Sequence, residues 1–279
     1  MYSRMLDKQL EEWLAEDVGS GDLTSEALLP AEAVTCGIIH AKDTGILCGV
    51  EVARRVFQVL DPGLTFEALA RDGEPLEPGT LIAKITGSAR SVLTGERLAL
   101  NLLQHLSGIA TRTRKLADLA RPYGTRVVDT RKTTPGLRLL EKYAVRTGGG
   151  CNHRKNLVEM LMLKDNHIAV SGGVKEALAR AKAYASHMTK IEIEVESLEQ
   201  AREAVEGGAD VIMLDNMAPE AMKECVDMIS HRAVVEASGG IDEHNLEAAA
   251  AAGVDVISIG ALTHSVKALD ISLDVGEIK

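Results

Sequence analysis

The second half of the chain repeats one pattern, in which a short apolar run is followed by a helical segment and a turn. From Lys190 onward, such a run begins about every 22 residues. Two of the helical segments also close alike, at Gly207-Gly208-Ala209-Asp210 and at Ala252-Gly253-Val254-Asp255. Apolar strands that alternate with helices are typical of a parallel sheet covered by helices. The internal similarity favours a closed or nearly closed (β/α) barrel over a doubly wound sheet.

Apolar spacing also predicts where the elements of this barrel lie. Strands are expected where apolar residues run together between turn signals, and helices where they recur every three or four residues. The expected strands are 126–129, 160–164, 190–195, 211–214, 234–236 and 256–259. The expected helices are 174–186, 197–206, 219–229 and 242–251.

The first part of the chain has a different organisation. Residues 1–18 have the spacing of an amphipathic helix, which the turn at 19–22 ends, and either Asp22 or Thr24 is expected to cap the next helix. Between 33 and 86, short apolar runs broken by Pro-Gly turns predict a small α+β region with a mainly antiparallel sheet and a helix at 50–60. A long helix over 93–119 then leads to the barrel. The apolar face of the first helix is expected to consist of Met5, Leu10, Trp13 and Leu14.

Composition and charge limit the classes of function. The net charge of −10 argues against binding to nucleic acid, which requires a basic face. No apolar run approaches the length of a membrane span, and the charged residues 1–18 do not resemble a signal peptide. The four cysteines lack zinc-ligand spacing, so we expect free thiols in a cytoplasmic protein.

Polar residues follow every expected strand of the barrel. In a (β/α) barrel the carboxyl ends of the strands meet at one rim, where the chemistry lies. A single such residue often only caps a helix, but capping does not explain why six ends carry them. Because Glu192, Glu194 and Glu196 alternate, we expect all three to point the same way. The six ends are Asp129-Thr130-Arg131-Lys132, Lys164-Asp165-Asn166-His167, Glu194 with Glu196, Asp215-Asn216, Ser238-Gly239-Gly240 and Gly260-Ala261.

The last two strand ends have the composition of a phosphate site. Ser238-Gly239-Gly240 precedes an expected helix, and Gly260-Ala261 leads to His264 after the last strand. Glycine lets backbone N–H groups approach a phosphate, and a helix N-terminus favours negative charge. Barrels commonly hold phosphate after their last two strands, so a phosphorylated substrate is expected.

A basic segment lies between the first two expected strands. It carries a charge near +6, because only Glu141 and Glu159 oppose its basic residues, and it holds His153 and a glycine-rich run at 147–150 that we expect to be flexible. A solvated loop is the simpler interpretation, but strand-end cations bound the segment, and clustered Arg suits carboxylates and phosphates. We therefore expect a multiply anionic ligand. The basic residues are Arg131, Lys132, Arg138, Lys142, Arg146, Arg154, Lys155 and Lys164.

Two acidic residues, Glu194 and Asp215, are expected on the same rim. They are suited to holding a divalent metal, usually Mg²⁺ when phosphates are present. They are equally suited to binding ribose hydroxyls and offsetting positive charge on a sugar in the transition state. No His cluster suggests zinc, and Cys151 near His153 is expected to be a packing residue rather than a nucleophile.

These residues lie in motifs that resemble the quinolinate phosphoribosyltransferase family, also called carboxylating nicotinate-nucleotide pyrophosphorylase. The resemblance spans almost the whole chain, and its motifs occur in order. Those motifs are Glu16–Thr24, Gly95–Asn101, Asp129–Gly136, Gly148–Arg154, Leu163–His167, Glu192–Glu196, Leu214–Asn216, Glu236–Gly240 and Ile259–His264.

The resemblance implies a fold and a reaction. The fold is an N-terminal α/β sandwich domain over 1–110, an incomplete (β/α) barrel of the type II phosphoribosyltransferase kind over 111–265, and a tail, 266–279, that packs on the first domain. The reaction transfers phosphoribosyl from phosphoribosyl pyrophosphate to quinolinate with loss of CO₂, giving nicotinate mononucleotide for NAD biosynthesis. The implied cofactor is Mg²⁺, and the implied assembly is a homodimer with a shared active site, with higher oligomers left open.

The resemblance also implies roles for individual residues. The quinolinate carboxylates would be gripped by Arg131, His153, Arg154 and Lys164, and Lys132 would lie between them and the pyrophosphate. Thr130 would also bind substrate. Glu194 and Asp215 would meet ribose and metal, directly or through water, and Arg97 would reach across the dimer. The catalytic residues would be Lys132, Glu194 and Asp215. The 5′-phosphate would be held by Ser238, Gly239, Gly240, Ile259, Gly260 and Ala261, with His264 near.

Three other functions stay open from the residues. The first is a phosphoribosyltransferase of the same fold that acts on another aromatic acid. The second is a non-catalytic phosphate-binding barrel, which would not need both Glu194 and Asp215. The third is an aldolase that uses Lys164 as a Schiff base.

Overall fold

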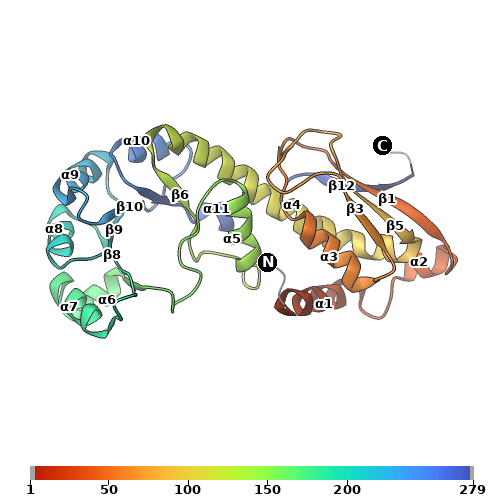
Figure 1. The fold of residues 1–279 in the computed structure, drawn as a ribbon, viewed down its shortest axis with the longest axis horizontal. Helices are drawn as coiled ribbons and strands as arrows, with labels where there is room; N and C mark the ends of the chain where they lie inside the picture. The colour runs from red at the N-terminus through yellow and green to blue at the C-terminus, as the bar shows by residue number, and fades with distance from the viewer. Residues whose placement is uncertain (1–3, 277–279) are drawn as a thin grey trace. The chain divides into compact units, whose positions relative to one another are not determined.

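The computed structural model describes residues 4–276, which form two units (Figure 1). The first unit is the chain up to Thr111 together with the segment from Val266 onward. The second unit is Arg112–Ser265. The ends of the expected first helix and of the expected tail, at 1–3 and 277–279, lie outside the described residues.

The first helix, α1 (Arg4–Val18), packs on α3 (Val50–Leu60), and two residues of its expected apolar face, Leu10 and Leu14, are buried. Leu6, Leu10 and Leu14 are buried, whereas Met5 is 57% exposed. The i, i+4 row through Leu10 and Leu14 runs back to Leu6, and Met5 lies about 100° round the helix from that row. The prediction for Met5 was therefore wrong. Trp13 is only partly buried.

Asp22 caps the second helix, α2 (Leu23–Leu28), as the sequence suggested. Its carboxylate accepts the backbone N–H of Ser25 at 3.0 Å and the Ser25 hydroxyl at 2.6 Å. Thr24, the alternative cap, lies inside the helix.

The expected antiparallel sheet of the first unit is confirmed. Its strand order is β12-β1-β5-β3, and a short ladder of β2 (Gly45–Ile46) and β4 (Pro75–Leu76) lies beside it. The last described strand therefore pairs with the first, because Ile39 of β1 lies opposite Leu273 of β12. The bounds are β1 Val34–Ala41, β3 Thr65–Ala68, β5 Leu81–Ser88 and β12 Ile271–Val275.

The long helix α4 (Ala89–Ala120) contributes residues to both units and is longer than predicted at both ends. Gly108 allows the returning tail to approach it closely. A Cβ atom at Gly108 would lie 2.3 Å from the carbonyl oxygen of Lys267, so a larger residue would push the tail away. Among residues 4–276, no helix is long and apolar enough to cross a membrane.

The second unit contains a six-stranded parallel sheet in the order β6-β11-β10-β9-β8-β7, with helices on its outer side (Figure 1). The edge strands β6 and β7 do not pair with each other within the described residues. A closed barrel is thus wrong, and the incomplete barrel is confirmed. The strands are β6 Arg126–Val128, β7 Leu161–Leu163, β8 Ile191–Val195, β9 Val211–Asp215, β10 Val234–Ser238 and β11 Val256–Ser258.

Four covering helices agree with the predicted ones to within a few residues, and three further helices of the described second unit were not predicted, the third being α11 (Ala261–His264). The first of these, α5 (Arg138–Thr147), lies inside the basic segment and buries Leu140, Ala144 and Val145. The glycine run that follows contacts α4, because Arg114 of α4 donates to the carbonyl of Gly148 at 3.0 Å. The second unpredicted helix is α6 (Asp165–Ser171). The four covering helices are α7 Val174–Tyr184, α8 Leu198–Glu206, α9 Pro219–Ile229 and α10 Leu246–Ala251.

Candidate active site

A pocket of about 510 Å³ opens at the carboxyl ends of the parallel strands, where the sequence placed the chemistry. Strand ends converge there because all six strands of the sheet point the same way. The predicted site residues in its wall are Thr130, Arg131, Lys132, His153, Arg154, Lys164, Glu194, Asp215, Ser238, Gly239 and Gly240.

Asn216, which was expected at the rim next to Asp215, also lies in the wall, and three further wall residues were not predicted from the sequence: Met162, Met213 and Ser258. Met162 lies two residues before Lys164, and Met213 lies two residues before Asp215. Side chains two residues apart on a strand point to the same face. Counting back two residues from Lys164 and Asp215 therefore identifies Met162 and Met213.

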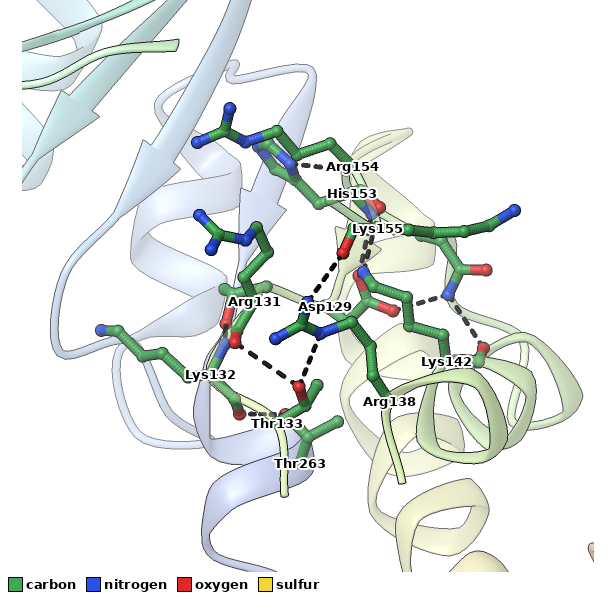
Figure 2. A network of polar contacts seen from close by, with 12 residues as sticks. Asp129, Arg131, Lys132, Thr133, Arg138, Lys142, His153, Arg154, Lys155 and Thr263 are labelled. Atoms are coloured by element: carbon green, nitrogen blue, oxygen red, sulfur yellow. Dashed lines mark hydrogen bonds and ion pairs between the residues drawn. The ribbon is translucent and has the colours of Figure 1, made fainter. Parts of the chain in front are cut away.

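Three cations of the pocket lack a carboxylate partner among the described residues: Arg131, Lys132 and Arg154. Figure 2 shows their charged ends directed to the same side, away from Asp129 and Lys142. The buried Nε of Arg154 has no hydrogen-bond partner. Burial and the nearby charge of Arg131 lower the pKa of Arg154. Unpartnered donors and mutually repelling cations are costly, and an anionic ligand would offset that cost.

The fourth cation, Lys164, is paired with an acid of the same pocket. Its Nζ lies 2.6 Å from Oε2 of Glu194 on the neighbouring strand. Lys164 is 45% exposed and Glu194 is 11% exposed. The third glutamate of the alternating set, Glu196, lies outside the wall and is exposed. The expectation that Glu196 points with the others was wrong, because β8 ends at Val195 and the alternation ends with it.

Two buried carboxyl groups, Glu192 and Glu236, lie beneath the pocket next to His153. Nε2 of His153 is 3.1 Å from Oε2 of Glu192 and 3.8 Å from Oε1 of Glu236. Burial and the negative charge of Glu192 raise the pKa of Glu236 to about 7. Burial by itself lowers the pKa of His153, but the hydrogen bond to Glu192 and the charges of both acids outweigh it, so the net shift is upward.

The glycine turn after β10 is shaped by the neighbouring strand end. Gly239 has φ +92°, and a Cβ there would lie 2.2 Å from Oδ1 of Asn216, so only glycine fits. Asn216, itself at φ +53°, donates its backbone N–H to the carbonyl of Ser238 at 3.0 Å. The side chain of Asn245 donates to the carbonyl of Gly240 at 3.0 Å. This turn brings main-chain groups to the pocket wall.

The two domains of one family match the chain in sequence. The model of the quinolinate phosphoribosyl transferase N-terminal domain matches residues 22–107, and that of the C-terminal domain matches residues 109–274. The chain belongs to the quinolinate phosphoribosyltransferase family.

Relatives of this family are similar over nearly their full length. A probable carboxylating nicotinate-nucleotide pyrophosphorylase of Bacillus subtilis is 46% identical, over 99% of this chain and 95% of that protein. A decarboxylating mitochondrial quinolinate phosphoribosyltransferase of Nicotiana glauca is 40% identical, over 94% of this chain and 80% of that protein. The crystal structure of NadC from Streptococcus pyogenes superposes with a TM-score of 0.96 at 44% identity, covering 100% of this chain and 99% of that one.

Within this quinolinate phosphoribosyltransferase fold, five predicted site residues lie outside the pocket wall. Gly260 lies beside it, because a Cβ at this position would be 2.8 Å from Cδ of Lys132. The neighbouring Thr263 donates its hydroxyl to the carbonyl of Lys132 at 2.7 Å and so holds that residue in place. Arg97 belongs to the first unit, where its side chain is 60% exposed. The five are Arg97, Ile259, Gly260, Ala261 and His264.

A metal is implied by the family resemblance, and the donors present suit Mg²⁺. Glu194 and Asp215 offer carboxylate oxygens to the pocket, the ligand type that Mg²⁺ prefers. Among the described residues, the potential ligand atoms that come within 4.8 Å of one another belong to a different set, namely His153, Glu192 and Glu236. That set is enclosed and contains an imidazole nitrogen engaged with Glu192, so it is a poor match for a hydrated Mg²⁺.

Proposed function

We propose that this pocket is the active site of a quinolinate phosphoribosyltransferase, which joins quinolinate to phosphoribosyl pyrophosphate and releases pyrophosphate and CO₂. The observation that carries the proposal is the composition of the wall: the unpartnered cations lie between the edge strands β6 and β7, whereas the carboxylates and the glycine turn lie at the ends of the central strands β8, β9 and β10. A dicarboxylate and a phosphorylated sugar require these two kinds of surface together.

Quinolinate is proposed to bind on the basic side. Arg131 and Arg154 have free guanidinium donors for its two carboxylates, and Thr130 and His153 complete that wall. Lys164 would leave Glu194 for a substrate carboxylate, which is a near-neutral exchange because one carboxylate replaces another. Lys132, held by Thr263, would lie between quinolinate and the pyrophosphate.

The sugar phosphate is proposed to bind on the opposite side. Glu194 and Asp215 would meet the ribose hydroxyls and hold Mg²⁺, directly or through water. Magnesium, when bound with the pyrophosphate, supplies charge neutralisation of the leaving group. The turn Ser238-Gly239-Gly240 would hold the 5′-phosphate through its main-chain groups. The neighbouring residues Ile259, Gly260, Ala261 and His264 are proposed to complete that site from beyond the present wall.

The chemistry needs positioning and charge more than a covalent intermediate. The ring nitrogen of quinolinate attacks the anomeric carbon as pyrophosphate departs, and positive charge develops on the sugar, which Glu194 and Asp215 would offset. The ring nitrogen of the product is cationic. Its positive charge therefore stabilises the electron pair that stays on the adjacent ring carbon when the carboxylate leaves as CO₂, and that carbon then accepts a proton.

The assembly proposed from the family is a homodimer in which Arg97 of one subunit completes the site of the other. Its support here is that Arg97 is an exposed cation, 4.0 Å from Glu96 in a weak contact, and so is free to meet an anion. We also propose a cytoplasmic location, because none of the four cysteines forms a disulfide bond, as is usual in a reducing compartment.

The test is a product assay with purified protein, quinolinate, phosphoribosyl pyrophosphate and Mg²⁺. Nicotinate mononucleotide, pyrophosphate and CO₂ are expected in equal amounts. Product from nicotinate but not quinolinate would favour a related phosphoribosyltransferase, and binding without turnover would favour a phosphate-binding barrel. Borohydride trapping of a substrate on Lys164 would favour an aldolase. The ion pair with Glu194 disfavours that outcome, since a Schiff base needs a neutral amine.

A further inference from the structure

We propose that the buried ion pair of Asp129 and Lys142 consists of positioning residues for quinolinate recognition, acting through His153 and Arg154. This inference rests on the proposed function of the pocket. Neither residue of the pair lies in the pocket wall. Their effect on a substrate must therefore pass through the residues they hold.

The pair lies where the barrel is incomplete. At the edge of the sheet, Cys151 forms an isolated bridge with Val128 and donates its N–H to Val127 at 2.9 Å. The backbone ladder ends there with a long contact of 3.3 Å from Asp129 N–H to the carbonyl of Cys151. The chain that carries His153 and Arg154 follows immediately, and it has no strand partner of its own within the described structure. Something other than a sheet must hold it.

Asp129 and Lys142 hold the main chain of His153 at both of its polar groups (Figure 2). Oδ1 of Asp129 accepts the N–H of His153 at 2.8 Å, and Nζ of Lys142 donates to its carbonyl at 3.0 Å. Lys142 also donates to Oδ1 of Asp129. Asn152 binds both partners, donating to Oδ2 of Asp129 at 2.6 Å and to the carbonyl of Lys142 at 2.8 Å.

The imidazole of His153 in turn holds the backbone of Arg154 in place. Nδ1 accepts the backbone N–H of Arg154 at 2.7 Å, so the ring proton is on Nε2, which faces Glu192. All four polar atoms of His153 are thus bound within the protein, and the ring has no free donor for a substrate carboxylate. His153 is then a rigid support, and the guanidinium of Arg154 is the group that meets the anion.

The energetics favour positioning over stability as the reason for the pair. The side chains of Asp129 and Lys142 are 0% and 3% exposed. Burial raises the pKa of Asp129 and lowers that of Lys142, even though each is the counter-ion of the other. A buried ion pair often contributes no more to stability than apolar residues of the same size. Apolar residues, however, would not supply the acceptor for the backbone N–H of His153 or the donor to its carbonyl.

The test is the double variant Asp129→Asn/Lys142→Met, which removes both charges and keeps the side-chain volumes. We expect it to fold, with a melting temperature near that of the wild type, and to raise the KM for quinolinate roughly 10- to 100-fold. The KM for phosphoribosyl pyrophosphate should change less than threefold. The matched control is Asp210→Asn/Lys190→Met, which removes a surface ion pair of 2.6 Å, and both KM values should stay unchanged.

The ¹⁵N chemical shifts of the His153 imidazole report its tautomer. That tautomer would not change if the ion pair only stabilised the fold. The wild type should show His153 as the Nε2–H tautomer, and the double variant should show a mixture. If the double variant fails to fold, Asn152→Ser removes only the bridging amide and should raise the quinolinate KM in the same direction. An unchanged quinolinate KM in the folded double variant, or in Asn152→Ser, would overturn the proposal. A wild type that forms no product would refute the proposed function, while the tautomer would still report on the positioning.

Discussion

The ammonium of Lys164, just after β7, and the carboxylate of Glu194, in the adjacent strand β8, lie 2.6 Å apart and so neutralise each other in the pocket wall. A substrate carboxylate can replace Glu194 as the partner of Lys164, and Glu194 is then released to the sugar. We expect Lys164→Ala to lower kcat/KM for quinolinate by about 1.5–3 kcal/mol, or roughly 10- to 150-fold.

Folding should survive this change, because Lys164 is nearly half exposed. Circular dichroism and thermal melting should match those of Lys175→Ala, a control that breaks an exposed pair with Glu203 on the outer helices. Activity retained in Lys164→Ala would contradict the assignment of Lys164 to quinolinate.

Arg131 should contribute to the preference for quinolinate, which has two carboxylates, over nicotinate, which has one. With Mg²⁺, the wild type should turn over quinolinate and hardly use nicotinate, because an unpaired pocket cation opposite a missing carboxylate is costly. Arg131→Ala should lower quinolinate turnover at least tenfold and so reduce the ratio of quinolinate turnover to nicotinate turnover. Initial rates with both acids, with and without EDTA, measure both effects. Equal use of the two acids by the wild type would argue against a dicarboxylate site.

Asp215 should act mainly in the transition state. Its carboxylate accepts a hydrogen bond from the side chain of Asn216 at 2.6 Å, and the residue lines the pocket at the end of the central strand β9. Asp215→Asn keeps that shape and removes the charge, so we expect kcat to fall roughly 100-fold while quinolinate affinity changes little. Steady-state kinetics measures the effect on kcat, and calorimetry measures the effect on quinolinate affinity. Weaker quinolinate binding at normal kcat would be the opposite of what we predict.

Glu236 should make stability depend on pH. Its pKa rises from 4.5 to about 7 on folding, because of burial and the charge of Glu192. The folded protein therefore binds this proton more tightly than the unfolded chain, and stability falls as pH rises from about 4.5 to about 7. The loss is on the order of 3 kcal/mol at most.

The variant Glu236→Gln should remove much of this dependence. Urea unfolding at several pH values between 4.5 and 6.5, compared with the wild type, isolates the contribution of Glu236. The range ends there because the raised pKa of His153 acts in the same direction at higher pH. A parallel pH dependence in the two proteins would show that Glu236 is ionised throughout.

Arg97 offers a test of the shared active site. Arg97→Ala and Lys164→Ala should each keep at most about a tenth of wild-type activity alone. When the two are unfolded and refolded together, half of the dimers are mixed and each carries one intact site, so up to about a quarter of wild-type activity is expected. No recovery, with subunit exchange demonstrated by mass spectrometry, would mean that Arg97 does not act in the partner's site.

Much of the barrel rim follows from local pattern. Lys164, Glu194 and Asp215 stand at or just beyond the ends of short apolar strands, and the parallel sheet brings such ends together. The same reasoning failed at Glu196, because alternation says nothing of where a strand stops. It also failed for α5. The segment was interpreted by its basic residues, and the apolar face that packs inside the unit was not recognised.

The sequence by itself therefore determined the fold family, the rim and the kinds of charge on it, since all of these depend on periodicity and on neighbours along the chain. Only the tertiary structure decided which charges are buried and with whom. Asp129 with Lys142, and Glu192 with Glu236, are charged residues whose burial and partners the sequence pattern did not predict. They meet because an incomplete barrel brings distant segments together, and a buried charge persists only where such a partner is supplied.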